Sequence, residues 1–257
     1  MKKSKFKVGK IIVDYFYSKD NPPEKIALFL YGFPYSLGAN EVTKFLVEEK
    51  FGVIQMQYPG TNDSEGAHEP ETAINSVSTL INSLSDTIID LGKNVKVQLP
   101  NKIPLVVGYS FGGFVAVNSV SFLPDLESLI LISPTITFGI NTIFDSGVRE
   151  SFNQHIPYVK RTRPLTYRLG NLKKWEKLYS GFYDTNTYQT SIKCCSIFGA
   201  NDSTFEKETL MANYEKVLKK KLSLKHHNLI IDRTGSHKMS SLNQELLHKC
   251  ITEVIND

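Results

Sequence analysis

The sequence predicts an α/β protein whose doubly wound, mostly parallel sheet carries an inserted helical cap. Apolar runs of strand length alternate with segments of helical spacing along most of the 257 residues. A Gly-x-Ser-x-Gly turn follows one of these runs, at 108–112. Between 135 and 190 no strong strand occurs and aromatic residues are frequent. This stretch indicates a cap subdomain inserted within a single domain that spans 1–257.

The first half of the chain supplies one side of this sheet. Ile11–Tyr17 is rich in β-branched and aromatic residues and is expected to be an edge strand. Lys25–Tyr31 is a nearly continuous apolar run, which is typical of a strand buried on both faces of a parallel sheet. Glu41–Lys50 has helical spacing, and Val53–Tyr58 is expected to be the next strand. Apolar residues recur every three or four positions from Thr72 to Leu91, which predicts an amphipathic helix.

The second half of the chain continues the same alternation. Its expected elements are a strand, turn and helix in Leu105–Ser121, strands at Leu126–Ile132, Ile192–Phe198 and Asn228–Asp232, and helices at Phe205–Lys219 and Leu242–Ile255. Strands that alternate with helices of these lengths predict a doubly wound, mostly parallel sheet.

The turn at 108–112 carries the candidate nucleophile. Gly108-Tyr109-Ser110-Phe111-Gly112 follows an apolar run and precedes a helix-like segment, which is the nucleophile-elbow pattern. So tight a turn strains the backbone of the serine, and the residues two positions away must therefore be small. The NH groups that begin the helix then face any negative charge that develops nearby. The alternative is a glycine-rich turn with an incidental serine.

A serine nucleophile needs a base and an acid that orients the base. Asp202 and His237 each follow an expected strand, at the carboxyl end where the loops of a parallel sheet converge. The order Ser110, Asp202, His237 is the order that this kind of elbow requires. Asp232 is an alternative orienting acid, because it is close to His237 in sequence.

The other histidines after Asp202 are poorer candidates for the base. His226 and His227 begin the last expected strand and so lie at its wrong end, and His248 lies inside the closing helix. We expect these three histidines to be surface or packing residues.

Two backbone NH groups are expected to form an oxyanion hole. One belongs to Phe111, directly after the nucleophile, and the second to Phe33, in the turn after the first buried strand. The alternative is that Gly32 only permits this turn. Tyr31 and Tyr109 flank these groups and are candidate substrate-binding residues.

With these residues in this order, the chain resembles the α/β-hydrolase superfamily over nearly its whole length. The resemblance implies a sheet of the α/β-hydrolase type, Ser110 as nucleophile, His237 as general base and then acid, and Asp202 as orienting carboxylate. Tyr-Pro-Gly at 58–60 looks like the start of a loop that lipase-like and aminopeptidase-like members carry. The chain has Tyr-Gly at 31–32 where members commonly have His-Gly, so the substrate is harder to infer.

Composition excludes several functional classes. A net charge of +4 is far from the profile of a nucleic-acid binder. No dinucleotide fingerprint, phosphate loop or metal-ligand cluster occurs in the sequence, and we expect no cofactor and no metal. Met1–Lys10 holds five lysines without a following apolar segment, and the apolar run at 103–120 contains the elbow, so no integral membrane segment is expected. Three cysteines, two of them adjacent, indicate reduced thiols and a cytoplasmic location.

The function predicted from these residues is a serine hydrolase that cleaves a carboxylic ester or thioester through an acyl-enzyme. Its substrate is expected to be a small molecule, and the aromatic and basic side chains of the cap would suit an apolar acyl chain or an anionic group. An aminopeptidase-like amidase or an acyltransferase on the same residues is an alternative. Because a fold does not fix a function, a hydrolase-derived binding protein with little turnover is another.

Overall fold

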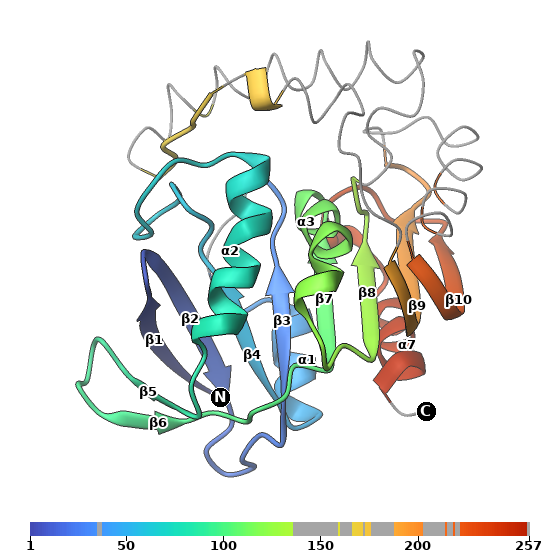
Figure 1. Ribbon diagram of the computed structural model, residues 1–257. Helices are drawn as coiled ribbons and strands as arrows, with labels where there is room; N and C mark the ends of the chain where they lie inside the picture. The colour runs from blue at the N-terminus through green and yellow to red at the C-terminus, as the bar shows by residue number, and fades with distance from the viewer. Residues whose placement is uncertain are drawn as a thin grey trace.

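The computed structural model of the protein describes residues 1–34, 38–135, 159, 166–171, 173–175, 188–202, 214, 218 and 222–255 (Figure 1). Its strands are β1 (Lys2–Val8), β2 (Ile11–Tyr17), β3 (Lys25–Leu30), β4 (Phe51–Met56), β5 (Thr87–Ile89), β6 (Lys96–Gln98), β7 (Leu105–Tyr109), β8 (Ser128–Ile132), β9 (Tyr188–Gly199) and β10 (Leu222–Asp232). Its helices are α1 (Glu41–Glu48), α2 (Pro70–Ser83), α3 (Phe111–Ser119) and α7 (Gln244–Ile255), with short 3-10 turns η1 (Val120–Phe122) and η2 (Met239–Ser241).

The main sheet is parallel except at one edge. Within the described residues it has eight strands in the order β1-β2-β4-β3-β7-β8-β9-β10. From β4 to β10 each neighbouring pair is parallel, whereas β2 pairs with both β1 and β4 in the antiparallel direction. The predicted doubly wound, mostly parallel sheet is thereby confirmed.

Helices cover both faces of this sheet. In Figure 1, α2 and α3 lie in front of the strands, and α1 and α7 lie behind them. The central strands are therefore buried on both faces, and Leu28, Ile54, Val106 and Ile130 have no exposed surface. This double burial explains why these strands are continuous apolar runs in the sequence. No helix in the described part of the chain is long and apolar enough to cross a bilayer.

The predicted edge strand Ile11–Tyr17 is β2, but it is not at the edge. β1 pairs along its whole length from Lys2↔Tyr17 to Val8↔Ile11 and forms the edge instead. Lysines alternate with buried residues along β1 and leave a charged row on the outer side. Lysines at an edge strand discourage pairing with another chain, so this composition suits an edge position.

The predicted helix from Thr72 to Leu91 is too long, because α2 ends at Ser83. Leu84 has an extended backbone, and the chain then forms the β5–β6 hairpin, in which Ile88 is opposite Val97. The Asp90 carboxylate accepts hydrogen bonds from two NH groups of the hairpin turn, both at 2.9 Å. A local Asx turn therefore replaces the last turns of the helix that the apolar spacing predicts.

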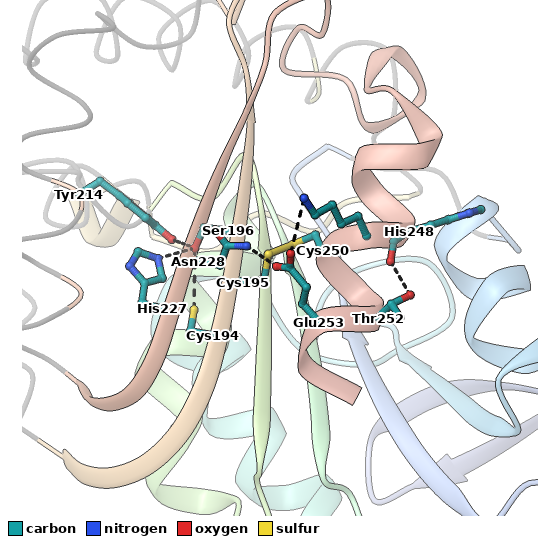
Figure 2. Close-up of a disulfide and its surroundings, with 11 residues drawn as sticks. Cys194, Cys195, Ser196, Tyr214, His227, Asn228, His248, Cys250, Thr252 and Glu253 are labelled. Atoms are coloured by element: carbon teal, nitrogen blue, oxygen red, sulfur yellow. Dashed lines mark hydrogen bonds and ion pairs between the residues drawn. A yellow bond between two sulfur atoms is a disulfide. The ribbon is translucent and has the colours of Figure 1, made fainter. Parts of the chain in front are cut away.

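The prediction of reduced cysteines is wrong for two of the three. A disulfide joins Cys195 of β9 to Cys250 of α7, with their Cα atoms 5.6 Å apart (Figure 2). Successive residues of a strand point to opposite faces, so Cys195 faces α7 while Cys194 faces away from it. Cys194 is a free, buried thiol near Ser196, and burial raises the pKa of this thiol to about 12.

Most of the predicted cap at 135–190 lies outside the described residues, as does the predicted helix at 205–219 apart from Tyr214 and Leu218. Two of its described pieces, residues 166–171 and 173–175, are yellow in Figure 1 and lie at the edge toward which the parallel strands point. The first of these pieces pairs with the loop after β4 through isolated bridges, Thr61↔Tyr167 and His68↔Leu169.

Candidate active site

The turn between β7 and α3 holds the backbone of Ser110 in a conformation that residues other than glycine rarely adopt. The serine has φ 52° and ψ −120°, and α3 begins at the next residue. A Cβ on Gly108 would lie 2.7 Å from the Gly112 carbonyl oxygen, and one on Gly112 would lie 2.0 Å from the Leu30 carbonyl oxygen. The predicted need for small residues two positions from the serine is therefore confirmed.

Three side chains from three loops form a continuous chain of hydrogen bonds. Ser110 Oγ lies 2.9 Å from His237 Nε2, and His237 Nδ1 lies 2.8 Å from Asp202 Oδ2. The Asp202 side chain is almost fully buried, whereas that of His237 is 26% exposed. A serine, an imidazole and a carboxylate in this order can move a proton from the hydroxyl to the imidazole and stabilise the resulting imidazolium.

The loops that carry Asp202 and His237 lie against each other. A Cβ on Gly199, at the end of β9, would lie 2.4 Å from the backbone of Gly235, in the loop after β10. The Asn201 NH donates to the Gly235 carbonyl at 2.8 Å. Since β9 and β10 are parallel neighbours, their carboxyl ends bring the acid and the imidazole to the same place.

Asp232, the alternative orienting acid, is engaged elsewhere. Its carboxylate accepts hydrogen bonds from the Thr234 NH at 2.9 Å and the Asn243 NH at 2.5 Å. Burial alone would raise the pKa of Asp232, but these bonds and one from the Gly235 NH outweigh burial and lower it. Asp232 thus anchors the loop before His237 to the segment that starts α7.

The three other histidines after Asp202 lie away from Ser110. His227 Nε2 lies 3.2 Å from Ser196 Oγ, and His226 is exposed on the same strand. The His248 ring stacks on Phe45 of α1, with ring centroids 4.1 Å apart. These contacts agree with the surface and packing roles predicted for all three.

The two predicted oxyanion donors belong to backbone segments that adjoin the nucleophile. Phe111 is the first residue of α3, where NH groups have no partner within the helix. A Cβ on Gly32 would lie 2.9 Å from Ser110 Cβ, so the turn that holds Phe33 approaches the nucleophile closely. The peptide from Phe33 to Pro34 is cis.

The two tyrosines predicted to bind substrate have other contacts. Tyr31 is 3% exposed, and its hydroxyl donates to Gln55, so this side chain points into the core. The Tyr109 hydroxyl donates to the His237 carbonyl at 3.1 Å and so helps to hold the histidine loop. Burial raises the pKa of Tyr109, which keeps this hydroxyl a donor.

An aromatic cluster beside the oxyanion donors was not predicted. Its members are Phe33, Tyr58, His68, Phe111, Tyr167 and Trp175, whose ring centroids lie 5.0–6.1 Å from one another in nine pairs. His68 is fully buried within it, and the cost of burying an imidazolium lowers its pKa to about 3. The only signal in the sequence is the frequency of aromatic residues in the predicted cap.

Comparisons with known proteins agree on the architecture. An esterase from Pyrococcus furiosus superposes over 99% of this chain and 89% of its own, with a TM-score of 0.66 and 17% identity. An epoxide hydrolase from Bacillus megaterium superposes over 98% of this chain and 100% of its own, with a TM-score of 0.65 and 13% identity. The chain has the α/β-hydrolase fold. Mouse alpha/beta hydrolase domain-containing protein 10 shares this α/β-hydrolase fold over 100% of this chain and 99% of its own, with a TM-score of 0.63 and 13% identity.

Searches with the sequence itself match no family model and no curated protein. At these identities the structural neighbours establish the α/β-hydrolase fold and leave the chemistry to the side chains. Among the described residues no group of three histidine, cysteine or acidic side chains could hold a metal ion.

Proposed function

We propose that this chain is a serine hydrolase that cleaves carboxylic ester or thioester bonds of small molecules through an acyl-enzyme. One observation carries the proposal: Ser110 Oγ lies 2.9 Å from His237 Nε2, whose other ring nitrogen lies 2.8 Å from a buried carboxylate. The esterases among the structural neighbours support it as an analogy of fold.

In the proposed mechanism, Ser110 Oγ attacks the carbonyl carbon while His237 Nε2 takes the hydroxyl proton. The oxyanion that forms accepts hydrogen bonds from the NH groups of Phe33 and Phe111. Asp202 stabilises the imidazolium, which then protonates the leaving alcohol or thiol as its bond to carbon breaks. Water attacks the acyl-enzyme, again losing its proton to His237, and the acid product leaves as Ser110 recovers its proton.

The composition of the predicted cap supplies the argument for the substrate class. The aromatic residues that are frequent in the predicted cap suit an apolar acyl group, and its excess of basic residues suits an anionic one. The predicted cytoplasmic location stays a prediction, and the disulfide between Cys195 and Cys250 removes one of its grounds.

The test is turnover on three panels: p-nitrophenyl esters of increasing chain length, acyl-CoA thioesters followed by thiol release, and aminoacyl anilides. We expect turnover of esters or thioesters and a loss of about 10⁶-fold in kcat for Ser110→Ala. Ser119→Ala removes a fully buried serine from the far end of the same helix and serves as the matched control. Turnover of anilides alone would indicate an amidase, and binding without turnover would indicate a binding protein.

A further inference from the structure

One side chain from the predicted cap contacts both residues that supply the proposed oxyanion donors. The Trp175 ring centroid lies 5.0 Å from that of Phe33 and 5.3 Å from that of Phe111. It also lies 5.1 Å from the His68 ring, and Trp175 has no exposed surface. The indole therefore fills the space beside the two donor residues and excludes water from it.

The indole is held from the loop after β4. The Trp175 Nε1 group donates to the His68 carbonyl oxygen at 3.1 Å. The same carbonyl accepts from the Gly170 NH at 3.2 Å, and the His68 NH donates to the Arg168 carbonyl at 2.8 Å. Hydrogen bonds between the two segments therefore hold the indole against the loop after β4.

An acidic side chain completes this attachment. Glu69 Oε2 lies 2.6 Å from Lys174 Nζ, and Glu69 Oε1 accepts from the Asn171 NH at 2.8 Å. Burial would raise the pKa of Glu69, but these two contacts outweigh it and lower the pKa. A Cβ on Gly170 would lie 2.2 Å from Glu69 Oε1, so the segment has little room to shift.

We propose that Trp175 is a positioning residue that sets the separation of the Phe33 and Phe111 NH groups. This inference rests on the proposed function, because it concerns the oxyanion that the mechanism forms. Donors stabilise an oxyanion only at about 2.7–3.1 Å, so a small displacement of either loop weakens the transition state more than the bound ester. The part of the predicted cap at 166–171 and 173–175 thereby contributes to catalysis without touching the reacting atoms.

Trp175 is the single tryptophan of the sequence, so its fluorescence reports on this place alone. A fluorophosphonate that reacts with Ser110 puts a phosphoryl oxygen where the oxyanion would form. We expect the emission of Trp175 to shift on labelling, because its two neighbouring residues would donate to that oxygen. Unchanged emission in fully labelled protein would overturn the proposal, and this measurement needs no variant.

The kinetic test compares Trp175→Leu, Trp175→Phe and Tyr15→Leu on the best ester substrate. We expect kcat to fall about 10- to 100-fold in Trp175→Leu with KM within about twofold, and Trp175→Phe to recover most of the loss. Tyr15 is a fully buried aromatic residue of β2, far from Ser110 in the sheet order, and its replacement controls for general destabilisation. We expect Tyr15→Leu to lower the melting temperature and leave kcat and KM unchanged.

Two results would refute the inference alone while the proposed function stands. One is an unchanged kcat in Trp175→Leu when Ser110→Ala abolishes turnover. The other is a raised KM with unchanged kcat, which would make Trp175 a contact for substrate. Retained turnover in Ser110→Ala would instead overturn the proposed function and this inference together.

Discussion

Replacing His68 by phenylalanine should remove a large part of the loss of stability in acid. His68 is fully buried among aromatic rings, and its pKa is lowered to about 3. In the unfolded chain its pKa returns to about 6.5. Between these two values the unfolded state binds a proton that the folded state does not, so stability falls as pH falls through this window.

The expected decrease in the free energy of unfolding follows from the difference between the folded and unfolded pKa values of His68. Each pH unit between about 6.5 and 3 costs about 1.4 kcal/mol, and the whole window costs about 5 kcal/mol. A phenylalanine keeps an aromatic ring among the neighbours of His68 and binds no proton. We therefore expect the stability of His68→Phe relative to the wild type to rise as pH falls from 7 to 4.

The assay is urea unfolding followed by circular dichroism at half-unit steps of pH. His226→Gln, at an exposed histidine, is the matched control and should follow the wild type. Parallel stability curves for His68→Phe and the wild type between pH 7 and 4 would refute the reasoning. They would mean that the buried imidazole accepts a proton in the folded state.

Three further changes test other parts of the structure. Asp202→Asn should lower kcat for ester hydrolysis about 10⁴-fold with little change in folding, and a loss below tenfold would argue against its orienting role. Cys250→Ser opens the disulfide to Cys195, which closes a loop of 55 residues, and should lower the free energy of unfolding by about 4 kcal/mol in urea titrations. Gly112→Ala should cost about 3 kcal/mol or prevent folding, because a Cβ there would meet the Leu30 carbonyl; a melting temperature equal to wild type would contradict this geometry.

The central strands could be predicted from the sequence because burial on both faces leaves a local signature. β3 and β8 are uninterrupted apolar runs, and each ends at a turn that the sequence marks with glycine or proline. β1 was not predicted, because its lysines are also typical of a solvent-exposed amino terminus and the partner strand is not evident from the sequence. The hairpin after α2 was not predicted, because Ile88 and Leu91 continue the helical spacing of the apolar residues before them.

The three hydrogen-bonded site residues could be predicted because each follows a strand of one parallel sheet. Topology therefore brings them to a common edge, and spacing in the sequence does not matter. The burial of Tyr31 could not be predicted, because its position next to Gly32 does not reveal that its side chain turns into the core. His68 and Trp175 could not be found, because they meet through pairing between a loop and an insertion, neither of which has a periodic pattern.

The central claim is that Ser110 is an activated nucleophile, and covalent labelling tests it most directly. Wild-type protein treated with a fluorophosphonate should gain one adduct, and digestion followed by mass spectrometry should locate it on Ser110. The Ser110→Ala variant should gain none, and His237→Ala should react far more slowly, since His237 Nε2 lies 2.9 Å from the hydroxyl. Stoichiometric labelling of folded Ser110→Ala, or a wild-type protein that stays unlabelled, would contradict the account.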